Sequence, residues 1–87
     1  VAGVSFLFGL SDSNIDEAAV KRAMLSSARE VIVLADHTRI GVESLVQIAP
    51  IERVHRFITS SGVSERDQQE FLRRGIRVTV ADQLYTP

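Results

Sequence analysis

Residues 31–35 form an unbroken run of apolar side chains that stops at Asp36. The run begins with three β-branched residues in succession, which is typical of strands. A strand without alternation of apolar and polar residues is normally covered on both faces, as in a parallel sheet between helices. A run of this length is too short to cross a membrane. This segment therefore predicts a buried strand and constrains the fold more than any other feature.

The residues around this run alternate between strand-like and helix-like patterns. Residues 15–28 have the 3.6-residue period of an amphipathic helix, with Asn14 as N-cap and Glu17 three residues later. The spacing places Lys21, Arg22 and Arg29 on the outward face. The predicted buried face consists of Ala19, Val20, Ala23, Met24 and Ser27.

A second helix is predicted over residues 65–74. Ser64 precedes it as an N-cap, acidic residues fill its first turn, and Gly75 follows its last turn as a C-terminal stop. Strands are predicted over residues 4–8, 44–49, 56–59 and 76–81, with a turn at residues 9–13. The order β–α–β–(β)–β–α–β predicts an α/β fold with a mainly parallel sheet flanked by helices. We expect residues 1–82 to form the folded unit and residues 83–87 a tail.

Composition excludes several classes of function. The 87 residues include no cysteine, so we expect no thiolate metal site, no thiol nucleophile and a reducing, cytoplasmic setting. His37 and His55 lack metal-ligand spacing, and no glycine-rich nucleotide motif occurs, so neither a metal nor a cofactor is expected. With ten basic and eleven acidic side chains and a single lysine, the chain lacks the basic stripe of a DNA-binding surface.

Ligands of parallel sheets bind at the carboxyl ends of the strands, which directs attention to the loop after residue 35. There Arg39 offers a planar fork of donors for a phosphate, and Thr38 adds a hydroxyl. Gly41 allows a close backbone approach, and Asp36 can accept hydrogen bonds from sugar hydroxyls. The alternative is that Asp36 caps the following turn and Arg39 is a solvated surface charge.

The loop that follows residues 56–59 is the second candidate. Thr59 and Ser60 place hydroxyl groups just before a helix N-terminus, which favours anions; the alternative is a plain turn and N-cap. Lys21 is a further cationic candidate, although solvation accounts for it equally well. The absence of a G-x-S-x-G elbow argues against nucleophilic catalysis.

Three segments, read in order, resemble the DeoR family of bacterial transcriptional regulators. The first is G-L-S at residues 9–11 with I-D-E-A-A-V-K-R-A-M at residues 15–24. The second is V-I-V-L-A-D-H-T-R-I-G at residues 31–41. The third is R-F-I-T-S at residues 56–60 with G-I-R-V-T-V-A at residues 75–81. The match runs in order over nearly the whole chain, from residue 9 to residue 81.

The resemblance implies the second half of a sensor domain that binds a phosphorylated sugar and thereby controls operator binding. Family members bind DNA through an N-terminal winged helix-turn-helix, for which these 87 residues show no counterpart. The sensor fold of the family is similar to that of sugar-phosphate isomerases and aminosugar-phosphate deaminases. By position, Arg39 stands where the family usually has a phosphate-binding lysine, and Asp36, Thr38 and Gly41 match directly. Ser60 replaces the family's usual aspartate and leaves effector choice open.

Other functions remain to be weighed against a non-enzymatic sensor. One is a sugar-phosphate isomerase or deaminase of the same fold, in which Asp36 would be the base. Another is a structural dimerisation fragment with a vestigial pocket. If the sheet is half of a larger one, its edge and apolar surface would recruit a second chain. We therefore expect a homo-oligomer, most simply a two-fold dimer in contact through residues 1–8 or the neighbouring strand.

Overall fold

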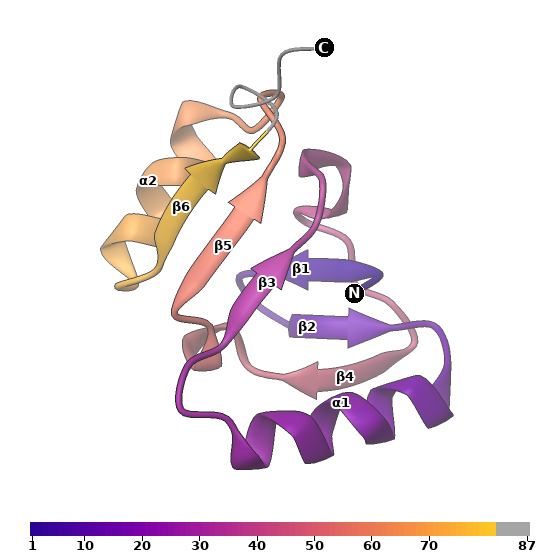
Figure 1. The fold of residues 1–87 in the computed structure, drawn as a ribbon. Helices are drawn as coiled ribbons and strands as arrows, with labels where there is room; N and C mark the ends of the chain where they lie inside the picture. Colours follow the sequence, from indigo (N-terminus) through magenta and orange to yellow (C-terminus); the bar gives the residue numbers. More distant parts are fainter. Residues whose placement is uncertain (82–87) are drawn as a thin grey trace, which may run out of the picture.

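The computed structural model describes residues 1–81 and arranges them around two separate sheets (Figure 1). The first sheet is antiparallel, with strand order β1-β2-β4. Its strands are β1 (Gly3–Ser5), β2 (Gly9–Asp12) and β4 (Val46–Ala49). Residues 9–12 of the predicted turn are therefore a strand, and residues 6–8 of the predicted strand 4–8 are the turn. The reversal occurs earlier, where Ser5 Oγ accepts hydrogen bonds from the backbone N–H groups of Leu7 and Phe8.

The second sheet is parallel, with strand order β3-β5-β6. Its strands are β3 (Ile32–Leu34), β5 (Arg56–Thr59) and β6 (Arg77–Val80), all within the ranges expected from the sequence. The α/β fold class is confirmed. A mainly parallel sheet is not, because residues 3–12 and 46–49 pair in a sheet of their own. Asp82 and the predicted tail lie outside the described residues.

Two α-helices and two short 3₁₀ helices connect the strands. Helix α1 (Ile15–Ser27) starts at Asn14, whose side chain accepts a hydrogen bond from the backbone of Glu17. Helix α2 (Glu65–Arg73) starts at Ser64, whose hydroxyl accepts from the backbone of Asp67. Gly75 follows with φ +80, the left-handed conformation that favours glycine at a helix end. Both predicted helices and both N-caps are therefore confirmed. The 3₁₀ helices are η1 (His37–Arg39) and η2 (Ile51–Arg53).

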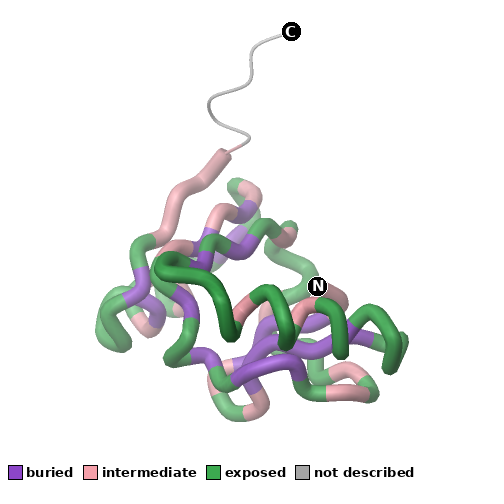
Figure 2. Tube along the Cα trace, turned by 60° about the horizontal axis from the view of Figure 1, so that its bottom comes forward, coloured by how far each residue is buried: buried purple, intermediate pink, exposed green. Residues whose placement is uncertain are grey.

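Helix α1 lies on the antiparallel sheet with a different face from the one predicted. Ala18 is fully buried, and Lys21 and Leu25 are partly buried one and two turns later. Val20 and Met24, which were predicted to face the core, are 61% and 66% exposed, and Figure 2 shows the helix as mostly exposed. The predicted helical period is confirmed, but the prediction of which side of the helix is buried is wrong. A partly buried lysine, paired with a carboxylate, makes the true buried face look polar.

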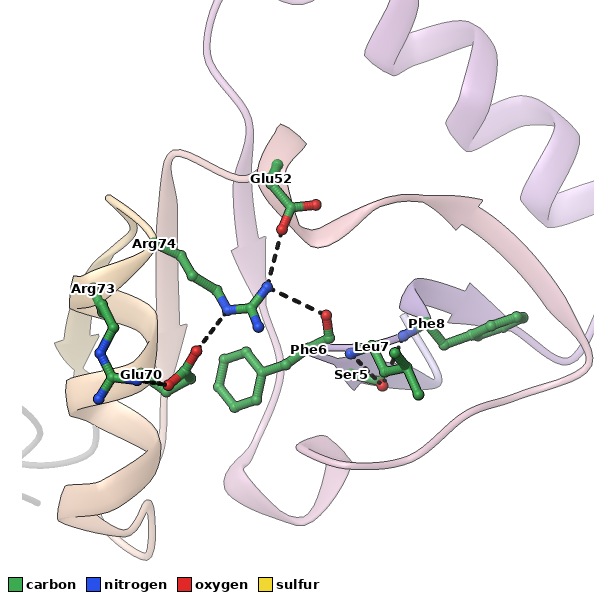
Figure 3. Close-up of polar contacts among 8 residues, drawn as sticks. All are labelled: Ser5, Phe6, Leu7, Phe8, Glu52, Glu70, Arg73 and Arg74. Carbon is green, nitrogen blue, oxygen red and sulfur yellow. Dashed lines mark hydrogen bonds and ion pairs between the residues drawn. The ribbon is translucent and has the colours of Figure 1, made fainter.

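An aromatic contact and an arginine join the two sheets. The Phe71 ring of α2 is fully buried and lies 4.8 Å from the ring of Phe57 in β5 and 4.6 Å from that of Phe6. Arg74 covers the Phe6 ring and bonds the Phe6 carbonyl, and its guanidinium also pairs with Glu52 (Figure 3). Through these contacts the turn between β1 and β2 is held against α2.

Candidate functional site

The carboxyl ends of the parallel strands surround an open hollow of about 310 Å³. The loops after β3 and β5, which the sequence singled out, both contribute to its wall. Ligands of parallel sheets bind at this edge, so the hollow is the natural candidate for an effector site. Its described lining consists of Leu34, Ala35, Asp36, Ile58, Thr59, Ser60 and Ala81.

The Asp36 carboxylate caps the 3₁₀ helix η1. Its Oδ1 accepts a hydrogen bond from the backbone N–H of Thr38 at 2.9 Å and another from the Thr38 hydroxyl. These bonds, the hydroxyl contact above all, lower the pKa of Asp36 and keep it ionised at neutral pH. The alternative that Asp36 caps the following turn is therefore correct for its Oδ1 atom. This cap also fixes the carboxylate at the rim of the hollow.

His37 and Ser60 join the two loops. The His37 backbone N–H donates to Ser60 Oγ at 2.8 Å, and His37 Nδ1 lies 2.7 Å from the same oxygen. The His37 ring also lies against Gly62, where any Cβ would collide with it. No pattern in the sequence indicated this contact between His37 and Ser60. Two loops that are far apart in the sequence are thereby held in one arrangement.

Arg39 and Gly41 follow on the exposed side of the same loop. Arg39 is exposed and makes no salt bridge within the described residues, so its guanidinium is available to an anion. Gly41 has φ +87 with open space around it, so backbone conformation rather than close approach requires glycine there. Its N–H donates to the carbonyl of Val4 at 2.8 Å, which ties the loop to β1.

Thr59 contributes to the hollow differently from Ser60. In β5 the buried residues are Phe57 and Thr59, so by strand alternation the Thr59 side chain shares the face of Phe57. Thr59 is only 4% exposed, and its hydroxyl has no hydrogen-bond partner among the described residues. Its place at the end of β5 shapes the wall, while Ser60 presents the hydroxyl at the rim.

Lys21 lies outside the hollow. Its ammonium pairs with the Asp12 carboxylate at 2.6 Å, and Asp12 also accepts from the backbone N–H of Ala2 at 3.0 Å. Burial alone would raise the pKa of Asp12, but the Lys21 hydrogen bond, the Ala2 N–H and the Lys21 charge outweigh it and lower the pKa. The prediction that Lys21 points away from the protein is wrong. Asp12, which ends β2, was not recognised from the sequence because turn residues surround it.

Two further observations concern residues 1–81 only. Within that range no helix is long and apolar enough to span a membrane. The same stretch contains no group of three or more histidine, aspartate or glutamate side chains that could hold a metal ion.

A small α/β unit with a hollow at the carboxyl edge of a parallel sheet is a common form of ligand-binding domain. The family model of the DeoR C terminal sensor domain matches residues 1–61, and the chain belongs to that family.

Curated relatives agree with this assignment. The HTH-type transcriptional regulator IolR of Bacillus subtilis is 33% identical over 67 residues, which are 77% of this chain and 27% of the relative. The HTH-type transcriptional regulator GlpR of Haloferax volcanii is 34% identical over 70 residues, 80% of this chain and 28% of the relative. The HTH-type transcriptional repressor GlcR of Bacillus subtilis is 30% identical over 83 residues, 95% and 32% respectively. The chain thus spans less than a third of these relatives, which are named as regulators rather than enzymes.

Proposed function

We propose that this chain is the effector-sensing part of a cytoplasmic transcriptional regulator and that its effector is a phosphorylated sugar. The observation that carries the proposal is the joining of two loops at the open hollow. Arg39 would hold the phosphate on the exposed side, the Asp36 carboxylate would accept hydrogen bonds from sugar hydroxyls, and Ser60 would offer its hydroxyl group to the sugar. A guanidinium without a salt-bridge partner among residues 1–81 suits a phosphate because it can bind two oxygens at once.

We propose that another part of such a regulator binds DNA. The relatives are named as HTH-type, yet the matched stretch is less than a third of each. The sequence carries no basic stripe comparable to that of a DNA-binding module, and its formal net charge is −1. We therefore assign sensing alone to these residues and propose that effector binding alters operator affinity in the longer polypeptide.

Calorimetry with paired sugars tests the effector class. We expect a phosphorylated hexose or pentose to bind and the same sugar without phosphate to fail. Arg39→Ala should weaken binding by about 1.5–3 kcal/mol, the range for a hydrogen bond to a charged group. Arg39→Lys is the matched control, because it keeps the charge while losing the planar fork. Equal affinity of parent and Arg39→Ala would refute the assignment of the phosphate contact.

The isomerase or deaminase alternative has its own test. Its only candidate base, Asp36, is exposed, has a lowered pKa and is engaged in capping η1, all of which disfavour proton abstraction. The relatives are named as transcriptional regulators. We expect no turnover of pentose or hexose phosphates, or of aminosugar phosphates, in a coupled assay. Turnover that disappears in Asp36→Asn would replace the sensor proposal with an enzymatic one.

A further inference from the structure

The hollow at the carboxyl ends of β3 and β5 has three described side chains that carry oxygen, and a ligand can reach two of them. The Thr59 hydroxyl oxygen is buried and therefore inaccessible to a ligand. Asp36 is exposed, Ser60 is half-buried, and both line the hollow. The other described lining residues are apolar: Leu34, Ala35, Ile58 and Ala81. Whether Asp36 and Ser60 donate or accept hydrogen bonds therefore decides which sugar groups this part of the hollow recognises.

Asp36 presents a hydrogen-bond acceptor. The pKa of its carboxyl is lowered, first by the hydrogen bond from the Thr38 hydroxyl and then by that from the Thr38 backbone N–H, so the group is ionised at neutral pH. Both bonds end on Oδ1. Oδ2 makes no hydrogen bond or ion pair within residues 1–81. Because an ionised carboxylate has no proton to donate, Oδ2 can only accept a hydrogen bond from a ligand.

The hydroxyl oxygen of Ser60 is bound twice by His37. The backbone N–H of His37 donates to Ser60 Oγ at 2.8 Å, and Nδ1 of the same residue lies 2.7 Å from this oxygen. A serine hydroxyl has one proton and two lone pairs, and a neutral imidazole has one donor and one acceptor nitrogen. Since the backbone N–H occupies one lone pair, Nδ1 either donates to the second lone pair or accepts the Ser60 proton.

The surroundings favour the arrangement in which Nδ1 accepts. A proton on Nδ1 would bring two N–H groups of one residue onto the same oxygen, and their hydrogens would repel each other. With Nδ1 as acceptor, the Ser60 proton is bound within the pair, and water can satisfy the Nε2–H because His37 is exposed. The imidazole also packs against Gly62, where a Cβ would collide with the ring, so its position is fixed. One lone pair of Ser60 Oγ is then left for a ligand.

The two acceptors lie close together. Ser60 Oγ is bound to the backbone nitrogen of His37, which is joined to the Cα of Asp36 through one carbonyl carbon. Ser60 Oγ is therefore at most about 6 Å from the Asp36 Cα. Two hydroxyl groups on adjacent carbons can bridge acceptors at such a separation.

Building on the proposed function, we propose that His37 positions Ser60 as a hydrogen-bond acceptor, so that the hollow selects a phosphorylated sugar with two adjacent hydroxyl groups. One hydroxyl donates to Ser60 Oγ and the other to Asp36 Oδ2. A sugar that places a carbonyl or a carboxylate here offers lone pairs to lone pairs and is rejected. Ser60 is in this way a specificity-determining residue, and His37 is a positioning residue that acts through it.

Nitrogen-15 NMR of the imidazole rings tests the His37–Ser60 pair without any ligand. At about pH 8.5, where exposed imidazoles are neutral, we expect His37 to carry its proton on Nε2. His55 is the internal reference, because its Nδ1 accepts from the backbone N–H of Val31 at 2.9 Å. Ser60→Asp should move the His37 proton to Nδ1, since a carboxylate only accepts, and should leave His55 unchanged. A protonated His37 Nδ1 in the parent, or no change in Ser60→Asp, overturns the proposal.

Calorimetry with glucose 6-phosphate and ribose 5-phosphate, each beside analogues that lack one hydroxyl group, tests the selection. One analogue of a sugar that binds should bind the parent about 3–10-fold more weakly, the range for one uncharged hydrogen bond. This deficit should fall below about twofold in Ser60→Ala. Loss of an adjacent hydroxyl should weaken binding about 10–100-fold in both proteins, because its acceptor is the charged Asp36.

Two variants of His37 separate positioning from packing. His37→Ala should abolish the Ser60-dependent deficit, because the Ser60 proton is then no longer held away from the ligand. His37→Asn should retain most of it, since its amide oxygen can take the place of Nδ1, and circular dichroism should show the parent fold for both. If a sugar phosphate binds but its deficit survives in Ser60→Ala or in His37→Ala, this inference fails and the sensor proposal stands. Failure of both sugar phosphates to bind contradicts the sensor proposal and removes the selection with it, whereas the imidazole spectra still decide the His37–Ser60 pair.

Discussion

In this protein the more polar strands β1 and β2 of one sheet are more deeply buried than the apolar strand β3 of the other. Strands β1 and β2 contain serine, glycine and aspartate, yet every residue in them is buried. Strand β3 is wholly apolar, yet Ile32 and Leu34 are exposed. Polar side chains are thus buried where hydrogen-bond partners lie nearby, and apolar side chains are exposed where no layer covers them.

The antiparallel sheet is buried because its polar groups are satisfied. Ser5 Oγ accepts from two backbone N–H groups of the turn and donates to Glu43 at 3.1 Å. Ser11 Oγ accepts from the backbone N–H of Ser44, and Asp12 is paired with Lys21. Burying a hydroxyl or a carboxylate is unfavourable only when its hydrogen bonds are not replaced. Apart from the turn bonds of Ser5, these pairings join residues 9 to 38 positions apart, too far to be read from a local sequence pattern.

The largest effect is expected where the two sheets are joined. Phe71→Ala removes the ring between Phe6 and Phe57 and should lower the free energy of unfolding by about 3–5 kcal/mol. For a chain of this size, such a loss is close to complete unfolding. Urea denaturation, with Phe71→Leu as the milder control, measures it. A loss below about 1 kcal/mol would mean that the sheets are held together elsewhere.

The next largest effects are expected at two glycines with positive φ, one beside each sheet. Gly9 (φ +86) begins β2 against the backbone of Ala49, whereas Gly75 (φ +80) precedes β6 with open space around it. Gly75→Ala should cost about 1–2 kcal/mol from the left-handed conformation alone. Gly9→Ala adds about 1–3 kcal/mol, because its Cβ collides with a strand backbone. Thermal unfolding of the two variants should therefore rank Gly9→Ala well below Gly75→Ala; the reverse order would contradict the described β2–β4 packing.

The ion pair between Asp12, which is buried, and Lys21, which is partly buried, makes the antiparallel sheet sensitive to acid. Asp12→Asn should lower the free energy of unfolding at neutral pH by about 1–2 kcal/mol, less than for a fully buried pair because Lys21 still touches water. The folded-state pKa of Asp12 is lowered, so its contribution is complete above the ordinary aspartate pKa and disappears as the pH falls through the folded value. Unfolding measured from about pH 7 to about pH 2.5 should show a shallower acid slope in Asp12→Asn than in the parent. Parallel slopes would show that Asp12 is not the group responsible.

The smallest effect is expected on the open face of β3. Leu34→Ala should change the free energy of unfolding of the monomer by less than about 0.5 kcal/mol, since the side chain already faces water. Val33→Ala, one residue earlier on the covered face, should cost about 1.5–3 kcal/mol. Urea denaturation measures both losses. Equal losses would show that the Leu34 face is covered within a single copy.

Local signals in the sequence predicted the parallel half of the fold and both helices. The run 31–35, the caps Asn14 and Ser64 and the stop at Gly75 each act within a few residues, so their physics is present in the chain itself. The same locality explains why Asp36, Thr38 and Arg39 were placed correctly after β3, and why Asp36 was recognised as a possible cap.

Contacts between distant segments decided the rest. The β1–β2 hairpin depends on Gln47 and Arg74 in addition to the local bonds of Ser5, and these distant contacts stabilise a turn that is otherwise made of apolar residues. The phase of α1 depends on Asp12, because its charge draws Lys21 onto the buried side of the helix. The link between His37 and Ser60 spans 23 residues, and their side chains meet only once β3 and β5 have paired. Periodicity determines which side chains share a face, but the free energy of burying that face depends on partners that only the tertiary structure brings near.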